Sequence, residues 1–191
     1  MNLTQVPNVI TVLRVVLVLP VVLALLNGQY GLALILFGVA GASDGLDGYI
    51  AKRYDCTSRF GSILDPLADK LLLVSTYLSL AWLGLLPWWL VVVVLLRDLL
   101  IVVGGFAYHR FVGEYDMSPS YISKLNTASQ ILLGFLVVLS MSLWPLSEWV
   151  IDGMIYFVLV TTILSGVDYV WIWGRRAMAA RADDNQNRSD G

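Results

Sequence analysis

Four aspartates lie at helical spacing within one short stretch of the sequence. Asp44 and Asp47 are three residues apart, and Asp65 and Asp69 are four apart. Each pair therefore lies on one face of a helix. If the two helices face each other, the four carboxylates share a small volume and repel one another unless cations neutralise them. Because carboxylate oxygens are ligands for hard divalent ions, the stretch predicts a site for Mg²⁺, Mn²⁺ or Ca²⁺.

Small and basic residues surround these acids. Gly48 and Ala51 lie on the face of the first pair, and Gly61 lies on the face of the second. Small residues leave room for a bulky ligand to approach the backbone. Lys52 and Arg53 follow directly. Metals held by carboxylates, with cations beside them, make a site for a diphosphate and stabilise the charge on its leaving oxygen.

The composition indicates a protein of the membrane. The chain has 191 residues, of which 58% are hydrophobic and 14% are charged. A soluble domain carries about 25% charged residues. At about 20 apolar residues per span, the length accommodates about six helices. The start of the chain lacks the pattern of a removed signal, so the first apolar run is predicted to be a retained span. Cys56 is the single cysteine, so an internal disulfide is excluded. We expect no nucleic-acid partner.

The apolar runs predict an all-α integral membrane protein, a bundle of six transmembrane helices. Residues 1–174 form the membrane domain in this prediction, and the polar residues 175–191 form a disordered tail. Short polar loops separate the spans. The predicted spans cover residues 8–26, 30–50, 61–86, 88–108, 121–144 and 149–173.

The basic residues predict the orientation of the bundle. They fall in the second loop, the fourth loop and the tail, and the other three loops contain neither Lys nor Arg. By the positive-inside rule, both termini and the acidic cluster are cytoplasmic. We expect a multi-pass protein of a bacterial inner membrane. The basic residues concerned are Lys52, Arg53, Arg59, Arg110, Arg175, Arg176, Arg181 and Arg188.

Two classes of function fit four acids at the ends of membrane spans. A single aspartate at a helix end is usually a cap, but clustered intramembrane acids indicate function. One class is a metal-dependent membrane enzyme, and the other is a transporter or channel for divalent cations. A channel has no need of the basic rim, and its acids would repeat along a pore. A non-catalytic lipid-binding scaffold is a third, weaker alternative. Such a scaffold would gain nothing from four carboxylates that repel one another.

The acidic stretch resembles the signature of the CDP-alcohol phosphatidyltransferase family, D-x-x-D-G-x-x-A-R-x(8)-G-x-x-x-D-x-x-x-D. Here the match begins at Asp44 and ends at Asp69, and its one departure is Lys52 in place of the arginine. The resemblance implies that a CDP-linked lipid, usually CDP-diacylglycerol, binds with its diphosphate on two divalent metal ions, Mg²⁺ or Mn²⁺. CMP then leaves as an acceptor hydroxyl attacks the lipid-side phosphorus. A homodimer is also implied.

The resemblance assigns roles position by position. Asp69 would be the general base and would also border the second metal. Lys52, or Arg53 in its place, would contact the nucleotide phosphates, although a lysine cannot form the bidentate contact of an arginine. The remaining positions are the metal ligands Asp44, Asp47 and Asp65, and the nucleotide-pocket residues Gly48, Ala51 and Gly61.

The acceptor is a separate question, because members of the family differ there. Other segments resemble the branches that make phosphatidylglycerol phosphate and cardiolipin. The first of these branches tends to carry G-K-x-K-T where this chain has Ser123 to Thr127, with neutral Asn126 in place of the second lysine. We therefore favour phosphatidylglycerol over glycerol 3-phosphate as acceptor. Arg97 and Asp98 are either an intramembrane pair or a phosphate contact. The acceptor-site candidates are Arg14, Arg97, Lys124 and Asn126.

Overall fold

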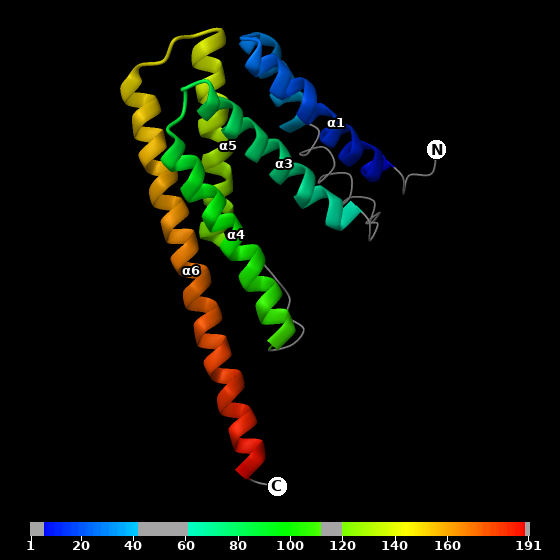
Figure 1. Ribbon diagram of the computed structural model, residues 1–191, viewed down its shortest axis with the longest axis vertical. Coiled ribbons are helices and arrows are strands. Elements are labelled where there is room, and N and C mark those ends of the chain that lie inside the picture. Colours follow the sequence, from blue (N-terminus) through cyan, green and yellow to red (C-terminus); the bar gives the residue numbers. More distant parts are fainter. Residues whose placement is uncertain (1–5, 42–60, 112–119, 190–191) are drawn as a thin grey trace. The chain divides into compact units, whose positions relative to one another are not determined.

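The computed structural model describes the backbone of residues 6–41, 61–111 and 120–189. Side chains are described for residues 13–41, 67–105 and 120–172. All regular structure in these ranges is helical, which confirms the predicted all-α class (Figure 1). The helices are α1 (Val6–Leu26), a helix over Tyr30–Gly41, α3 (Gly61–Trp82), α4 (Trp88–Phe111), α5 (Tyr121–Ser142) and α6 (Glu148–Ser189).

Three of these helices are long and apolar enough to cross a membrane. Within the described residues they are Trp88–Gly105 of α4, Tyr121–Ser142 of α5 and Glu148–Ile172 of α6, with mean hydropathies of 2.1, 1.5 and 1.9. Shorter apolar helices cover Leu13–Leu26 and Tyr30–Gly41. A bilayer core requires about 20 apolar residues in a helix. The chain is therefore a membrane protein by length and composition, and the topology of six spans remains a prediction.

The last helix is longer than the sequence analysis expected. α6 continues from the predicted span to Ser189. Residues 175–189, predicted as a disordered polar tail, thus continue the helix. The sequence R-R-A-M-A-A-R-A favours the helix over residues 175–182, since Ala, Arg and Met are among the best helix formers and neither Pro nor Gly interrupts them.

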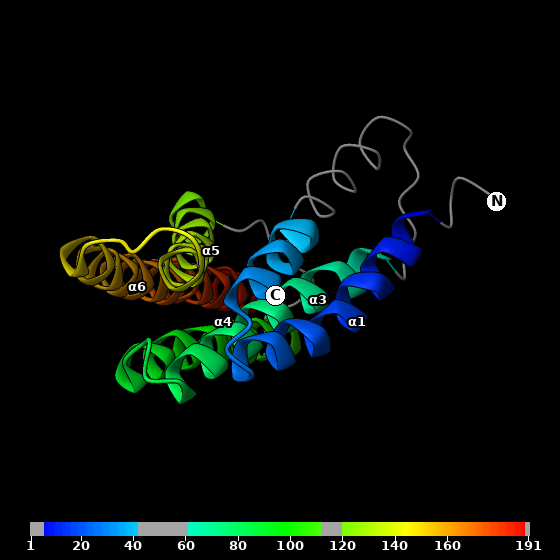
Figure 2. The same cartoon turned by 90° about the horizontal axis from the view of Figure 1, so that it is seen from above.

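The chain forms two compact units. The first contains Met1–Val91 and Ile131–Ile151. In this unit α1 packs along α3, as Figures 1 and 2 show. Its core includes Leu25, Tyr77 and Leu133, each at most 1% exposed. Burying such side chains is the main favourable term in packing helices together.

Two tight turns of the first unit contain glycines in the left-handed region. Gly28 follows α1 with a φ of 72°, and Gly84 follows α3 with a φ of 74°. After α3, the Gly84 amide donates to the Ala81 carbonyl and the Leu85 amide donates to the Leu80 carbonyl. These bonds satisfy carbonyls that the end of the helix would leave without partners. Only glycine adopts this backbone conformation without strain.

The second unit contains Val92–Gln130 and Asp152–Gly191, and its interior is unusually polar. Between α5 and α6, Asn126, Gln130 and Ser165 are 0% exposed. Polar side chains inside membrane helices hydrogen-bond across the helix contact instead of facing lipid. Arg97 of α4 lies in the same interior and is 7% exposed.

Candidate active site

Half of the predicted acidic site lies on α3. Because α3 begins at Gly61, its backbone places Gly61, Asp65 and Asp69 on one helix face, as the spacing predicts. The side chains before residue 67 lie outside the described residues, so the contacts of Asp65 stay open. The predicted site residues in the first half of the signature also lie outside the described residues; they are Asp44, Asp47, Gly48, Ala51, Lys52 and Arg53.

Asp69 forms an ion pair with Arg14. The Nη1 group of Arg14, on α1, donates to Oδ1 of Asp69, on α3. The Arg14 side chain is 1% exposed, whereas the Asp69 side chain is 47% exposed. The carboxylate of Asp69, the proposed base, is thus accessible from the protein surface, and the buried Arg14 holds it through an ion pair. Arg14, predicted as an acceptor-site candidate, contacts the proposed base.

The pairing explains how an arginine is accommodated in an apolar helix. A buried cation without a counter-charge costs several kcal/mol, as an order of magnitude. Arg14 lies within a helix whose neighbouring side chains are almost all aliphatic. An intramembrane cation of this kind needs a carboxylate, and Asp69 supplies it. An arginine in an apolar segment indicates that a carboxylate partner exists, but the sequence does not specify which aspartate that partner is.

A second polar centre surrounds Arg97 in the second unit. Its Nη1 group donates to Oδ1 of Asp98 at 3.0 Å. Its Nη2 group donates to Oγ of Ser123 at 2.6 Å and also to Oγ of Ser165. The guanidinium carbon lies 5.9 Å from the centre of the Tyr169 ring, close enough for a cation–π contact. Arg97 therefore connects α4 with α5 and α6, and the predicted intramembrane pair with Asp98 is present.

The two serine partners of Arg97 were not predicted. Ser123 and Ser165 are 8% and 0% exposed. A serine within an apolar helix more often bonds to its own backbone than to a distant side chain, so residue type alone gave no warning. Residues three and four apart share a helix face, and Ser165 and Tyr169 are so placed on α6. The spacing of Ser165 and Tyr169 on α6 was the one sequence feature that could have indicated partners for the intramembrane Arg97.

The two candidates on α5 point in different directions. Asn126 is 0% exposed, and its Oδ1 accepts hydrogen bonds from the hydroxyls of Thr161 at 3.0 Å and Thr162 at 2.9 Å. Lys124 is exposed, with its Nζ atom 5.6 Å from the centre of the Tyr121 ring. Asn126 therefore joins α5 to α6, and Lys124 faces outward.

Comparison with known families decides how these residues are to be understood. The family model for CDP-alcohol phosphatidyltransferases matches residues 4–171. The chain belongs to the CDP-alcohol phosphatidyltransferase family. The resemblance found in the acidic stretch is thereby confirmed. The signature of this CDP-alcohol phosphatidyltransferase family runs into α3 through Asp65 and Asp69.

Similar proteins come from two branches of this CDP-alcohol phosphatidyltransferase family. A probable cardiolipin synthase (CMP-forming) of Drosophila melanogaster is 33% identical over 186 residues, covering 88% of this chain and 58% of that protein. A probable phosphatidylglycerophosphate synthase of Mycobacterium tuberculosis is 34% identical over 175 residues, covering 88% of this chain and 81% of that protein. Human cardiolipin synthase (CMP-forming) is 32% identical over 148 residues, covering 69% of this chain and 49% of that protein. The chain thus spans between half and four fifths of the length of these relatives.

Proposed function

We propose that the protein transfers a phosphatidyl group from CDP-diacylglycerol to a glycerol-type hydroxyl and releases CMP. The observation that carries the proposal is Asp69, a half-exposed carboxylate at the end of the family signature, held by the buried Arg14. A general base must be accessible to its proton donor, and Asp69 is half exposed and fixed in orientation by Arg14. The product class is an anionic phospholipid, as the names of the relatives from both branches suggest.

In the proposed reaction, Asp69 accepts the proton of the acceptor hydroxyl. The oxygen of that hydroxyl forms a new bond to the phosphorus that carries the diacylglycerol group, and the bond from this phosphorus to the oxygen of CMP breaks. CMP leaves with the electron pair of that bond. Arg14 keeps the carboxylate oriented toward the outside of α3 during this step.

The proposed metal sites use Asp44, Asp47 and Asp65, with Asp69 at the border of the second site. The donor set fits, because α3 places Asp65 and Asp69 one turn apart on one face, and carboxylates suit Mg²⁺ or Mn²⁺. When bound, two such ions would neutralise the diphosphate and stabilise the charge on the leaving oxygen. For the nucleotide we propose a pocket formed by Gly48, Ala51, Lys52, Arg53 and Gly61.

For the acceptor we favour phosphatidylglycerol, which would make the protein a cardiolipin synthase. Glycerol 3-phosphate carries a dianionic phosphate that needs an available cation. Arg14 and Arg97, the two buried arginines among the described side chains, each have a carboxylate partner. Asn126 is neutral and is engaged with threonines. Glycerol 3-phosphate remains the alternative, for which the exposed Lys124 would be the first contact.

We further propose six spans, with both termini and the signature on the cytoplasmic side of a bacterial inner membrane, and a homodimer as the working assembly. The support is the confinement of basic loop residues to alternate loops together with the long apolar helices α4, α5 and α6.

An acceptor screen tests the proposed function. Purified protein with Mg²⁺ and CDP-diacylglycerol is offered phosphatidylglycerol, glycerol 3-phosphate, serine or inositol phosphate, and CMP release is measured. We expect the fastest release with phosphatidylglycerol. Release with glycerol 3-phosphate but not with phosphatidylglycerol would move the protein to the other branch.

The same preparation tests the different class of function, a divalent-cation transporter. The protein is reconstituted into liposomes that contain a metal-sensitive dye. Mn²⁺ is then added outside the liposomes without any CDP-lipid. An enzyme leaves the dye signal at the level of empty liposomes. Metal uptake in the absence of CDP-lipid, with no CMP release in its presence, would replace the transferase by the transporter.

A further inference from the structure

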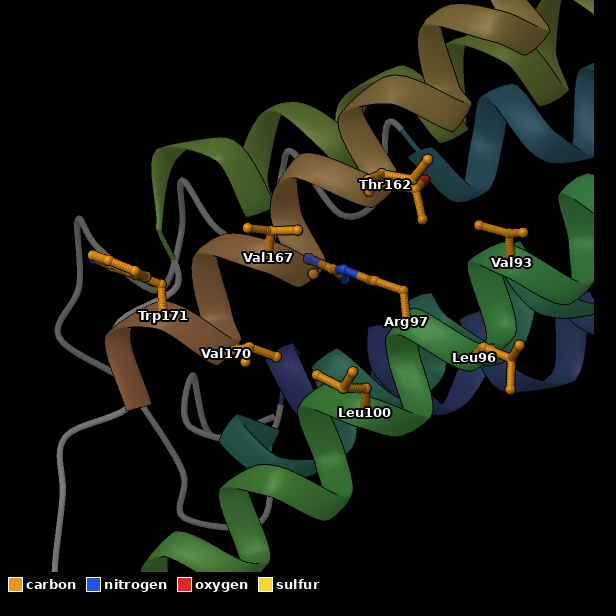
Figure 3. Close-up of a pocket in the computed structure, with 10 residues that line it drawn as sticks. Val93, Leu96, Arg97, Leu100, Thr162, Val167, Val170 and Trp171 are labelled. Atoms are coloured by element: carbon orange, nitrogen blue, oxygen red, sulfur yellow. The ribbon is translucent and has the colours of Figure 1, made fainter. Parts of the chain in front are cut away.

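A pocket of about 700 Å³ lies between α4 and α6 of the second unit (Figure 3). Pockets of this size accommodate a drug-sized or chain-like ligand. We call it the α4–α6 pocket. It is lined by Val93, Leu96, Arg97, Leu100, Thr162, Ile163, Gly166, Val167, Val170 and Trp171.

The wall of the α4–α6 pocket is apolar except at Arg97. Thr162, the other polar side chain in the lining, is 1% exposed, and its hydroxyl donates a hydrogen bond to Oδ1 of Asn126. Several apolar residues at the rim, among them Leu96 and Val167, are more than half exposed. The pocket is therefore open on the outer surface of the helix pair and does not end in a closed core.

The surroundings of the pocket favour a lipid as its occupant. The lining lies within the parts of α4 and α6 that are long and apolar enough to span a membrane. In such a segment the outer surface faces acyl chains, so an apolar pocket that opens there is filled from the bilayer.

Arg97 indicates the chemistry of the occupant beyond its apolar chain. Its Nη groups donate to Asp98, Ser123 and Ser165, but its buried Nε has no acceptor among the described residues. Figure 3 shows the side chain extending from α4 toward α6 across the pocket. Asp98 already neutralises the guanidinium, so a second anion would add repulsion. An uncharged acceptor oxygen fits this donor better than a phosphate does.

We propose that the α4–α6 pocket binds an ester-linked acyl chain of a bilayer glycerophospholipid. The chain lies along the aliphatic wall, and the ester carbonyl accepts a hydrogen bond from Nε of Arg97. Nε is buried in the structure, so this hydrogen bond requires the Arg97 side chain to rotate toward the pocket. The α4–α6 pocket is independent of the proposed phosphatidyl transfer, because it recognises the acyl chain of the lipid and its ester group and not the headgroup.

Photolabelling tests the proposal with a lipid that is neither a substrate nor a product. The full chain is placed in nanodiscs with phosphatidylcholine that carries a diazirine on one acyl chain, and labelled peptides are mapped by mass spectrometry. We expect labels concentrated on residues 93–100 of α4 and 162–171 of α6, several-fold above the exposed apolar positions of α5. Labelling spread evenly over all lipid-facing helices overturns the proposal.

Gly166 offers a matched pair of variants. A Cβ at this position would lie 3.8 Å from Cγ of Arg97, which is ordinary contact, so Gly166→Ala should leave the pocket open. Gly166→Leu should fill it and lower the labelling several-fold. Unchanged labelling of the folded Leu variant overturns the proposal. Val93→Phe narrows the pocket from α4 and replaces the Leu variant if that protein does not fold.

A second pair of probes tests the role assigned to Arg97. The diazirine is placed at the same carbon of an ester-linked and an ether-linked phosphatidylcholine. We expect the ester probe to label the pocket more strongly, because the ether lacks the carbonyl acceptor. Equal labelling, or much stronger labelling by a phosphatidylglycerol probe, shows that the ester carbonyl is not what Arg97 recognises and overturns that assignment.

Discussion

Arg14 and Asp69 form an ion pair whose two members differ sharply in exposure. The arginine side chain is 1% exposed and the aspartate side chain is 47% exposed. They lie on α1 and α3, which pack together in the first unit. The buried partner needs the pair in order to stay buried, and the exposed partner gains a fixed orientation from it. A carboxylate oriented in this way suits the base that the proposed reaction requires.

Replacing Asp69 with Asn should abolish catalysis while preserving the local structure. The amide oxygen can still accept a hydrogen bond from Arg14, but it cannot take a proton from the acceptor hydroxyl. We expect CMP release to fall by about 10²–10⁴-fold, the usual contribution of a general base. Binding of the CDP-lipid, measured by calorimetry, should persist.

Asp152→Asn is the matched control for this substitution. Asp152 is an exposed aspartate of α6 with no place in the proposed site, so its variant should retain full turnover. Full turnover of the Asp69→Asn variant itself would show that another group takes the proton.

Removing Arg14 should cost activity more than stability. Arg14→Met leaves behind an aspartate that is already half exposed, so the free energy of unfolding should change by only about 1 kcal/mol. Loss of a group that orients an active-site ligand lowers activity by about 10–100-fold. CMP release and thermal unfolding in the same detergent measure the two effects.

The reverse change supplies the comparison. Asp69→Ala removes the ion pair between Asp69 and the buried Arg14 and should lower the unfolding free energy by more than Arg14→Met does. If Arg14→Met lost stability and activity together, to the same degree as Asp69→Ala, the arginine would be a structural residue only.

The helices were predictable because long apolar runs have few other ways to satisfy their backbone groups in a membrane. The first span was predicted over residues 8–26, and α1 covers Val6–Leu26; the fourth was predicted over residues 88–108, and α4 covers Trp88–Phe111. For residues 175–189 the sequence predicted a polar tail, and the structure continues α6 through them to Ser189. Residues 175–182 of this segment, R-R-A-M-A-A-R-A, are strong helix formers despite their charge.

The chemistry of the site was predictable only in part. The face shared by Asp65 and Asp69 follows from their spacing, because the helix period fixes which residues line up. The contact between Arg14 and Asp69 joins residues 55 positions apart, and no local pattern specifies it. The burial of Asn126 was missed for the same reason, since its threonine partners lie on another helix.

Asn126→Leu should lower stability, because the substitution removes the acceptor of the Thr161 and Thr162 hydroxyls. The Thr161 hydroxyl keeps the Val158 carbonyl as an acceptor, but the buried Thr162 hydroxyl loses its bond. Leaving a buried polar group without a partner costs about 1–3 kcal/mol. Asn126→Lys should be worse, since it places a cation at a position that is 0% exposed. Thermal unfolding in detergent provides the measurement.

Lys124→Gln, two residues away on the exposed side of α5, should leave the unfolding temperature unchanged. An Asn126→Lys variant that unfolded at the wild-type temperature and switched from phosphatidylglycerol to glycerol 3-phosphate would restore position 126 as a determinant of the acceptor.

Two glycines should respond to alanine with opposite signs. Gly84, in the turn after α3, has a φ of 74°, so Gly84→Ala should destabilise the protein by about 1 kcal/mol. Gly153 lies inside α6, and nothing approaches its added Cβ within 4 Å. Gly153→Ala should stabilise the helix by about 0.5–1 kcal/mol. Thermal unfolding of both variants checks the signs, and stabilisation by Gly84→Ala would contradict the left-handed turn.

Removal of divalent metal should stop catalysis and lower stability together. Chelation by EDTA leaves the acids of the signature without the cations that offset their repulsion, so CMP release should fall to background and return with Mg²⁺ or Mn²⁺. A metal that binds only the folded state stabilises it by about 2.7 kcal/mol at a hundred times its Kd. Added Mn²⁺ should therefore raise the unfolding temperature of the wild type. The rise should shrink in Asp65→Asn, which lacks one proposed ligand, and persist in Asp152→Asn. Full CMP release after exhaustive chelation would remove the metal from the mechanism and leave Asp69 and Arg14 to be explained without it.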